Sequence, residues 1–366
     1  MKIVLLANAD SVHTVRWAAA LSAAGLEVIV ATQDDISPEM PPDVRVAVLP
    51  HSGQLGYFRN ARALRRLLAQ ERPDLVNAHY ASGYGTTARL ARFRPTLLSV
   101  WGSDVYSFPL RSRLHRWLLR ANLTAATKLA STSHAMARQT AGLLAGDRLA
   151  EIAITPFGVD MSRFQLGKAC KASDRIVVGT VKALQHVYGI DYLLRAFAAA
   201  RASLAATDPD LAGRTTLLIV GDGSERDELV ALAGTLGLTD VVTFRPHVAH
   251  DKVPAALHDL DVYVALSRME SFGVAVIEAS ACGLPVIVSD AGGLPEVVAD
   301  GKTGFVVPVG DVAAAADRIV TLVRDEGLRQ RMGSAGRART ADRYDWQANV
   351  RTMIAVYKDA LRGDCA

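Results

Sequence analysis

The sequence predicts an α/β protein that is divided into two domains, each built on a parallel sheet. Its 366 residues suit two domains of ordinary size, each large enough for its own core. The chain starts with a strand at residues 2–7, a helix at 12–24 that ends at Gly25, and a strand at 27–32. A strand–loop–helix–strand unit occupies residues 262–296. Each half therefore carries a unit that is typical of a parallel sheet.

The other predicted elements follow in order along the chain. A strand at residues 74–79 continues the first sheet, and the polar stretch 165–174 is interpreted as the linker between the domains. Strands at 176–179, 217–221 and 241–244 build the second sheet, with the last of them at its edge. A long helix at 345–361 ends the pattern.

The composition favours a folded protein of the cytoplasm. Half of the residues are hydrophobic, so disorder over most of the length is excluded. The three cysteines, Cys170, Cys282 and Cys365, have neither metal-ligand spacing nor the pattern of a disulfide framework, which fits a reducing compartment. No apolar run approaches membrane-spanning length, and the first residues form a strand rather than a signal peptide.

Charge is distributed unevenly between the two halves. Residues 1–160 hold 18 Lys and Arg against 12 Asp and Glu, a net charge of +6, whereas the remainder holds 23 against 25, a net charge of −2. A basic first half predicts an anionic partner for that half. Nucleic acid is not expected to be that partner, because aromatic residues are sparse and no nucleic-acid motif is present.

Two basic amphipathic stretches in the first half suggest what that partner is. The predicted helix at 58–71 carries Arg59, Arg62, Arg65 and Arg66, and the stretch at 111–120 carries Arg113, His115, Arg116 and Trp117. Such helices rest on anionic lipid head groups, which would make the protein peripheral on the inner face of the membrane. They are equally compatible with core-facing helices that have a solvated arginine face.

The most informative stretch is residues 262–296. Apolar runs at 262–266 and 284–289 predict buried parallel strands, and residues 274–282 have helix length, closed by Gly283. The loop at 267–273 then lies at the carboxyl end of a strand, where parallel sheets bind ligands. Glu270 falls in this loop and Glu278 in the second helical turn. The helix N-terminus favours an anion.

The spacing Glu270…Glu278 resembles the signature of family 4 glycosyltransferases. Ser-Phe-Gly follows the first Glu, Ala-Cys-Gly-Leu-Pro-Val occupies 281–286, Gly-Gly-Leu-Pro-Glu occupies 292–296, and Asp-Gly-Lys-Thr-Gly-Phe occupies 300–305. Such enzymes are retaining, depend on nucleotide sugars and have the GT-B fold, in which two Rossmann-like domains face each other across a cleft. The resemblance implies an acceptor-side domain at 1–165, a nucleotide-sugar domain at 166–344, and a C-terminal helix at 345–366 that crosses back.

The resemblance also assigns roles on the donor side. Lys182, with the helix N-terminus formed by Phe272, Gly273 and Val274, would stabilise the departing diphosphate. Glu278 would bind the ribose hydroxyls, and Glu270 would hold the donor sugar. Further expected donor contacts are Gly221, His247 and Val248.

The sequence departs from the family at the diphosphate. Relatives usually carry an Arg at the position of Lys182 and a Lys at the position of Tyr188, so that two cations have become one. His186 is a partial substitute for the missing cation.

On the acceptor side the expected residues are His13, Tyr80, Trp101 and Asp104. Many relatives have a His where Trp101 stands, and a Gly-Gly pair where the loop at 8–13 stands. His13 is expected either to contact the acceptor or phosphates, or to be incidental to the site.

The implied reaction is retaining transfer of a sugar, expected from a UDP-sugar, to a saccharide or lipid-linked saccharide in the synthesis of cell-surface polysaccharide or glycolipid. No cofactor and no metal are expected, because no Asp-x-Asp pair follows a strand, and His247, His250 and Asp251 fit a loop that runs into a helix N-cap. Two alternatives are a GT-B nucleotide-sugar epimerase and a sugar-nucleotide sensor without enzymatic activity.

Overall fold

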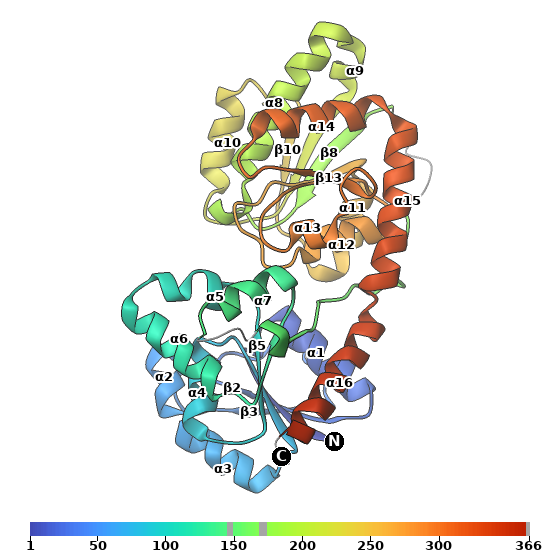
Figure 1. Cartoon of the computed structure of the whole chain (residues 1–366). Coiled ribbons are helices and arrows are strands. Elements are labelled where there is room, and N and C mark those ends of the chain that lie inside the picture. Colours follow the sequence, from blue (N-terminus) through green and yellow to red (C-terminus); the bar gives the residue numbers. More distant parts are fainter. Residues whose placement is uncertain (145–148, 168–173, 364–366) are drawn as a thin grey trace. The chain divides into compact units, whose positions relative to one another are not determined.

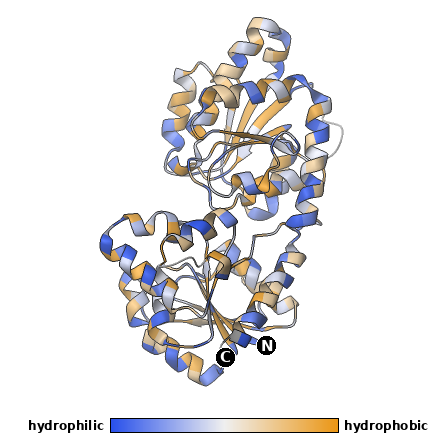
Figure 2. Ribbon diagram, in the orientation of Figure 1, coloured by the Kyte–Doolittle hydropathy of each residue, from blue (hydrophilic) through white to orange (hydrophobic). Residues whose placement is uncertain are grey.

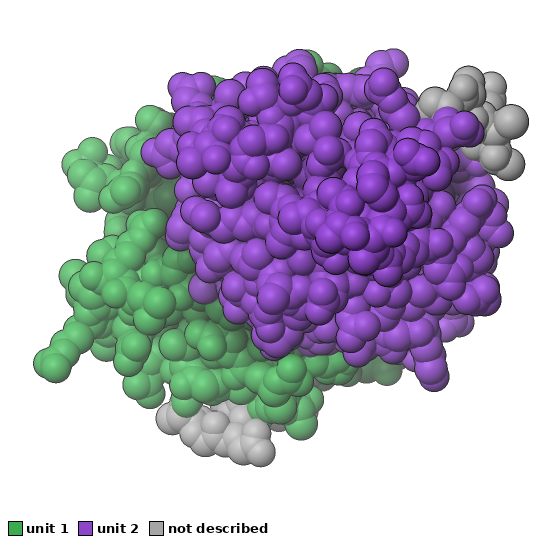
Figure 3. All heavy atoms as spheres, turned by 90° about the horizontal axis from the view of Figure 1, so that it is seen from above, with its two compact units in different colours: residues 1–156, 347–366 green, residues 157–346 purple. Residues whose placement is uncertain are grey.

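The computed structural model describes residues 1–144, 149–167 and 174–363. The chain divides into two compact units, which Figure 3 shows in green and purple. Unit 1 consists of Met1–Pro156 together with Gln347–Ala366, and unit 2 consists of Phe157–Trp346. Within the predicted linker at 165–174, residues 168–173 lie outside the described residues. Each unit is described here by itself.

Unit 1 contains a seven-stranded parallel sheet in the order β3-β2-β1-β4-β5-β6-β7. The chain order along the sheet reverses between β1 and β4, which is the topological switch point of a Rossmann-like sheet. Its strands are β1 (Lys2–Leu6), β2 (Glu27–Thr32), β3 (Arg45–Val48), β4 (Leu75–His79), β5 (Thr96–Val100), β6 (Lys128–Ser131) and β7 (Ile152–Ile154).

The helices of unit 1 lie against this sheet (Figure 1), and buried apolar side chains from both form a common core. Leu64, Tyr84 and Leu119 join one core cluster with residues of β1, β2, β4 and β5. The helices are α1 (Val12–Ala23), α2 (Gly53–Arg59), α3 (Ala61–Glu71), α4 (Gly83–Ala91), α5 (Ser103–Tyr106), α6 (Arg113–Ala125), α7 (His134–Ala141) and α16 (Trp346–Gly363). The terminal helix α16 is tied to the sheet by a buried hydrogen bond of 2.8 Å from the Asn77 amide to the Tyr357 hydroxyl.

The predicted single helix at 58–71 is wrong, because the structure has two helices that meet at Asn60. The Asn60 side chain is fully buried and donates to the Gln33 side chain at 3.1 Å and to the His51 carbonyl at 2.7 Å. The His51 amide in turn donates to the Asn60 side-chain oxygen at 3.1 Å. These long-range partners satisfy a buried amide at the junction, where a continuous apolar stripe was expected.

Unit 2 contains a six-stranded parallel sheet in the order β10-β9-β8-β11-β12-β13, and its strands are largely orange, that is hydrophobic, in Figure 2. The chain order reverses between β8 and β11, so that this pair of neighbouring strands forms the switch point. The strands are β8 (Ile176–Val181), β9 (Thr215–Val220), β10 (Val242–Arg245), β11 (Val262–Ala265), β12 (Val286–Ser289) and β13 (Gly304–Val307).

The helices of unit 2 complete its Rossmann-like layers. In Figure 1, α8 packs against α14, and α12 packs against α15. They are α8 (Ile190–Thr207), α9 (Pro209–Arg214), α10 (Arg226–Thr235), α11 (Val253–His258), α12 (Val274–Ala281), α13 (Leu294–Val297), α14 (Val312–Arg324) and α15 (Glu326–Arg343). The strand–loop–helix–strand unit predicted at 262–296 is confirmed as β11, α12 and β12, and the two parallel sheets confirm the predicted fold class.

Candidate functional site

Lys182 and Glu270 meet at the switch point of unit 2. Lys182 directly follows β8 and Glu270 lies in the loop after β11, so neighbouring parallel strands deliver both side chains to the same edge of the sheet. The Lys182 Nζ lies 2.5 Å from the Glu270 Oε2, and both side chains are mostly buried. Burial lowers the pKa of the Lys182 ammonium, but the adjacent Glu270 carboxylate outweighs this effect and the net pKa is raised. The two residues therefore form a charged pair.

Glycines hold the two loops that carry this pair. Gly221 has a φ of +153°, and a Cβ there would lie 1.9 Å from the Lys182 carbonyl oxygen. Gly292 has a φ of +52°, and a Cβ there would lie 1.9 Å from the Glu270 carbonyl oxygen. The amide of Gly293 also donates to that oxygen at 3.0 Å. In the structure Gly221, expected as a donor contact, serves the close approach of the chain to its own Lys182 loop.

The N-terminus of α12 points its first-turn amides toward the same edge of the sheet. Gly273, with a φ of +106°, precedes Val274, the first residue of the helix. Val276 donates its amide to the Gly273 carbonyl at 3.0 Å, so the first-turn N–H groups of Val274 and Ala275 are the candidates for binding an anion. The buried Phe272 ring packs between the rings of Phe157 and Tyr344, with centroid distances of 6.0 and 5.5 Å. The Phe272 side chain is thus part of the unit 2 core, and only its backbone remains a candidate for donor contact.

Glu278 pairs with His250, a histidine that was not among the expected donor contacts. Its buried carboxylate lies 3.0 Å from the Nε2 of His250, which begins a short 3-10 turn after β10. His247 is exposed and Val248 is half-buried. The sequence pattern missed this pairing because His250 and Glu278 are 28 residues apart. In the described part of the chain, no three His, Cys, Asp or Glu side chains gather closely enough to hold a metal ion.

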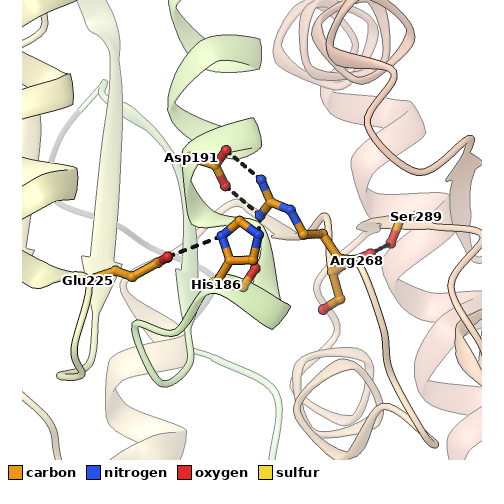
Figure 4. Close-up of polar contacts among 6 residues, drawn as sticks. His186, Asp191, Glu225, Arg268 and Ser289 are labelled. Carbon is orange, nitrogen blue, oxygen red and sulfur yellow. Dashed lines mark hydrogen bonds and ion pairs between the residues drawn. The ribbon is translucent and has the colours of Figure 1, made fainter. Parts of the chain in front are cut away.

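A second cation, Arg268, was missed by the sequence analysis. Its guanidinium forms two bonds of 2.7 Å with the Asp191 carboxylate and donates to the His186 carbonyl at 2.8 Å (Figure 4). It also lies 4.0 Å from the centre of the Tyr192 ring. Asp191 raises the pKa of Arg268, so the cation is permanent. This clamp fixes the loop after β11 against the turn and helix that follow Lys182, since Asp191 lies in the first turn of α8.

The remaining contacts around Lys182 involve Tyr188 and His186. The Tyr188 ring centre lies 4.3 Å from the Lys182 Nζ, which is cation–π distance. The His186 side chain is exposed, and its Nδ1 lies 3.2 Å from Glu225 (Figure 4). Tyr188 therefore contacts the cation, whereas the structure shows no contact of His186 with it.

In unit 1, Asp104 connects the loops that follow β4 and β5. Its buried carboxylate accepts hydrogen bonds from the backbone amides of Ala81 at 2.8 Å, Gly102 at 2.8 Å and Trp101 at 3.3 Å. Burial raises the pKa of Asp104, although these amides oppose the shift. The predicted acceptor-side Asp104 thus supports the two loops by binding their backbone.

An aromatic group gathers around Trp101 at the same edge. The Trp101 ring centre lies 4.1 Å from that of His79, 5.5 Å from that of Tyr80 and 5.8 Å from that of His13. Burial lowers the pKa of His79 to about 3, and the neighbouring His13 adds to this shift, so the imidazole of His79 is neutral. The structure brings together three predicted residues and adds His79, whose position as the last residue of β4 could have indicated it.

Unit 1 has a cavity of about 580 Å³ beside these loops. The loop after β4 contributes Tyr80 and Ser82, α2 contributes Tyr57 and Phe58, and Asp104 also lines it. Further lining residues come from the segment before α6, Phe108 and Arg111, and from α6 itself, Leu114, His115 and Leu118. Two of the four predicted acceptor-side residues therefore line one sizeable cavity.

Comparison with known proteins adds to this geometry. Sequence profiles of two families match, "Glycosyl transferases group 1" over residues 163–339 and "Glycosyl transferase 4-like" over residues 2–133. The chain is 30% identical to the D-inositol 3-phosphate glycosyltransferase of Actinosynnema mirum, over 97% of this chain and 93% of that relative.

Solved structures resemble the fold of both units. Sucrose-phosphate synthase from Thermosynechococcus elongatus has a TM-score of 0.82 and 23% identity, with 98% of each chain covered. Anabaena HepE, solved with UDP and glucose, has a TM-score of 0.80 and 22% identity, with 98% of this chain and 99% of that chain covered. The profiles, the full-length relative and the two Rossmann-like sheets together lead to one conclusion. The chain belongs to the group 1 glycosyltransferases of family 4, whose members have the GT-B fold.

Proposed function

We propose that this glycosyltransferase is a retaining enzyme that moves a sugar from a nucleotide sugar, in particular a UDP-sugar, to a saccharide or lipid-linked saccharide. The observation that carries the proposal is the Lys182–Glu270 pair beside the N-terminus of α12, at the switch point of unit 2. The switch point of a doubly wound sheet is where nucleotides bind. The choice of UDP is supported by the HepE structure, which was solved in complex with UDP and glucose.

The proposed chemistry starts with the loss of a nucleoside diphosphate. The bond between the anomeric carbon and the β-phosphate oxygen breaks, and negative charge grows on that phosphate. The Lys182 ammonium and the first-turn amides of α12 stabilise this charge. The acceptor oxygen bonds to the anomeric carbon on the same face, and the departing phosphate takes the acceptor proton. Glu278 binds the ribose hydroxyls and Glu270 holds the sugar.

The Lys182–Glu270 pair has a consequence for donor binding. In the free protein, Glu270 neutralises the cation that the diphosphate needs, with only 2.5 Å between the charged atoms. A complete donor offers a diphosphate to Lys182 and sugar hydroxyls to Glu270, so both members of the pair gain new partners together. A nucleoside diphosphate lacks the sugar and offers a partner to Lys182 alone.

The acceptor side of the proposal rests on the 580 Å³ cavity of unit 1. Its polar and aromatic lining, with Tyr57, Tyr80 and His115, suits a hydroxylated ring. Arg111 at the same cavity suits a phosphate on the acceptor or on its lipid carrier. Acceptors of this kind are named for two relatives, D-inositol 3-phosphate glycosyltransferase and phosphatidyl-myo-inositol mannosyltransferase.

A donor screen tests the proposal. Thermal-shift measurements with UDP-, GDP- and ADP-sugars should show one nucleotide class that stabilises the protein, and we expect UDP. Incubation with that donor and candidate saccharide acceptors should then release nucleoside diphosphate with the α- or β-configuration of the sugar retained. Isomerisation of the donor without an acceptor would instead identify an epimerase, and tight donor binding without any release would identify a sensor.

Glycosyl transfer should proceed without a divalent metal ion. The positive charge needed at the diphosphate is supplied by Lys182 and by the α12 N-terminus, so a metal has no required role there. Initial rates after dialysis against EDTA, with and without added magnesium, measure this. Activity that is abolished by EDTA and restored by magnesium would contradict the prediction.

The two basic stretches of unit 1 differ in what they expose. In α3, Leu64 and Leu68 are buried in the core, so its arginines form the solvated face of an ordinary amphipathic helix. In α6, Leu114 is 68% exposed and Trp117 is 61% exposed. Exposed apolar side chains also lie in α2 and just before α6: Leu55, Phe58 and Leu110.

We propose that the surface formed by the exposed apolar residues of α2, of α6 and of the segment just before α6 rests on an anionic membrane, on its cytoplasmic side. The exposed Leu114 and Trp117 alternate along α6 with the exposed Arg113 and Arg116, a pattern that combines apolar insertion with attraction to anionic lipid. Leu114 also lines the 580 Å³ cavity, so a lipid-linked acceptor could enter from that surface. None of the described helices is long and apolar enough to span a bilayer.

Liposome flotation should show salt-sensitive binding that depends on α6. The wild type should float with vesicles containing anionic lipid at low salt and less at high salt, because the attraction of the arginines is screened. Leu114→Ser with Trp117→Ser should abolish flotation. The matched control is Val230→Ser, an exposed apolar residue of α10 in unit 2. A wild type that never floats, or a double variant that floats equally well, would favour a soluble acceptor.

A further inference from the structure

Unit 1 has a second cavity, of about 300 Å³, that the proposed reaction does not use. Arg89 at the end of α4 and Arg92 and Arg94 just after it line this cavity, together with Thr96 and Asn122. Thr96 is the first residue of β5, whereas Trp101 and Asp104 follow the last one. The cavity therefore lies toward the amino ends of the strands, whereas the acceptor-side loops lie at their carboxyl ends.

The charge of this cavity is uncompensated. Three arginines line it, and its lining contains no aspartate or glutamate. Among the described residues, none of the three forms an ion pair. Burial lowers the pKa of Arg89, which reflects the cost of holding an unpaired guanidinium out of water. The carbonyl end of α4 stabilises one nearby cation, but a helix dipole alone does not explain three arginines around one cavity.

Arg89 is held in a fixed orientation by a buried asparagine. Its Nε donates to the Oδ1 of Asn122 at 2.8 Å, and Asn122 is 1% exposed. In the part of the chain that the structure describes, the two terminal nitrogens of Arg89 have no hydrogen-bond partner, so they remain available as donors. A pre-oriented guanidinium loses little freedom when it binds a planar or tetrahedral oxyanion.

We propose that this cavity binds the phosphate group of a small phosphate monoester, through Arg89, Arg92 and Arg94. Guanidinium groups bind phosphate through paired N–H···O bonds, and three of them more than neutralise a dianion. The volume is at the lower end of the range for small-molecule sites, which favours a compact phosphorylated metabolite over a nucleotide sugar.

The same asparagine connects this cavity to the acceptor side. The Nδ2 of Asn122 donates to the carbonyls of Ala81 and Ser82 at 2.8 and 3.1 Å, and to the Thr86 hydroxyl at 2.8 Å. Ser82 and Thr86 line the 580 Å³ cavity. A phosphate bound to Arg89 would therefore influence the position of the loop after β4, which lines the 580 Å³ cavity, through the buried Asn122 side chain. This regulatory consequence, unlike the binding itself, rests on the proposed function.

Calorimetric titration tests the binding without donor or acceptor. The probes are inorganic phosphate and glycerol 3-phosphate, at constant ionic strength set with chloride. The wild type should bind both, and Arg92→Gln with Arg94→Gln should weaken binding at least about tenfold, since two charge-assisted partners of the phosphate are lost. Both arginines are exposed, so the unliganded melting temperature should be unchanged.

Two controls separate this site from other anion sites. Arg113→Gln with Arg116→Gln removes the same charge from the exposed face of α6 and should leave phosphate binding unchanged. Lys182→Ala should also leave phosphate binding unchanged, which would show that the phosphate is not bound at the donor site in unit 2. Equal weakening in both double-arginine variants, or no titration heat beyond that of chloride, would overturn the proposal. If phosphate binds but acceptor KM does not respond to it, the binding site stands and its connection to the acceptor loop is wrong.

Discussion

Replacing Lys182 with alanine should lower the turnover number of glycosyl transfer by at least about 10²–10³, the usual cost of losing one donor to a developing oxyanion. The structure strengthens this expectation. Lys182 is the cation that directly follows the central strand β8, and a cation near it, Arg268, is bound bidentately to Asp191. Tyr188, where the resemblance implies that relatives carry a second cation, contacts Lys182 with its ring at 4.3 Å. We therefore expect the Lys182 ammonium to be the main side-chain cation that stabilises the departing diphosphate.

Two comparison variants and a stability measurement make this result interpretable. Tyr188→Phe should be mild, because the aromatic ring that faces the ammonium is retained. Lys252→Ala, at an exposed lysine of the same unit, controls for loss of one positive charge. Lys182→Ala leaves the mostly buried Glu270 unpaired, so the melting temperature of each variant should be measured beside its activity. Turnover within about threefold of wild type in a folded Lys182→Ala protein would mean that the diphosphate is held elsewhere.

The parts of the donor site that sequence could predict are those delivered by local pattern. Apolar runs with a glycine-closed helix between them placed Glu270 after β11 and Glu278 in α12. Lys182 was assigned through the family resemblance alone. Its pairing with Glu270 follows from the observed strand order, because β8 and β11 are neighbours and the carboxyl ends of neighbouring parallel strands lie side by side.

The contacts that sequence could not predict join residues distant along the chain. Asp191 and Arg268 are 77 residues apart, and no periodic pattern marks them as partners. The backbone of Phe272 was expected at the donor, but the sequence does not show where its ring lies, because the ring's partners Phe157 and Tyr344 come from the two ends of unit 2. Asn60 interrupts the helix at 58–71 through partners at 33 and 51. In each case tertiary contacts decided what local propensity left open.

The second large effect is expected from substitution of the two glutamates. One substitution should lower mainly the affinity for the nucleotide, and the other should lower mainly the turnover number. Glu278→Ala should weaken the affinity for the nucleoside diphosphate by about 10- to 100-fold, because hydrogen bonds to a charged group contribute roughly 1.5–3 kcal/mol and the ribose is present in donor and product alike. Glu270→Ala should instead lower turnover by at least about a hundredfold, since the sugar loses its orienting partner at the reacting centre.

The structure also predicts the direction in which the UDP affinity of Glu270→Ala should change. In the wild type, the diphosphate must compete with Glu270 for the Lys182 ammonium across 2.5 Å. Removal of Glu270 ends this competition, so UDP should bind as tightly as to wild type or more tightly, even though transfer is nearly lost. Calorimetric titration of UDP into both variants, with Glu228→Ala on the exposed face of α10 as control, measures this directly. An equal loss of UDP affinity in the two variants would refute the assignment of Glu270 to the transferred sugar, because removal of a residue that contacts only that sugar should not weaken the binding of UDP, which lacks it.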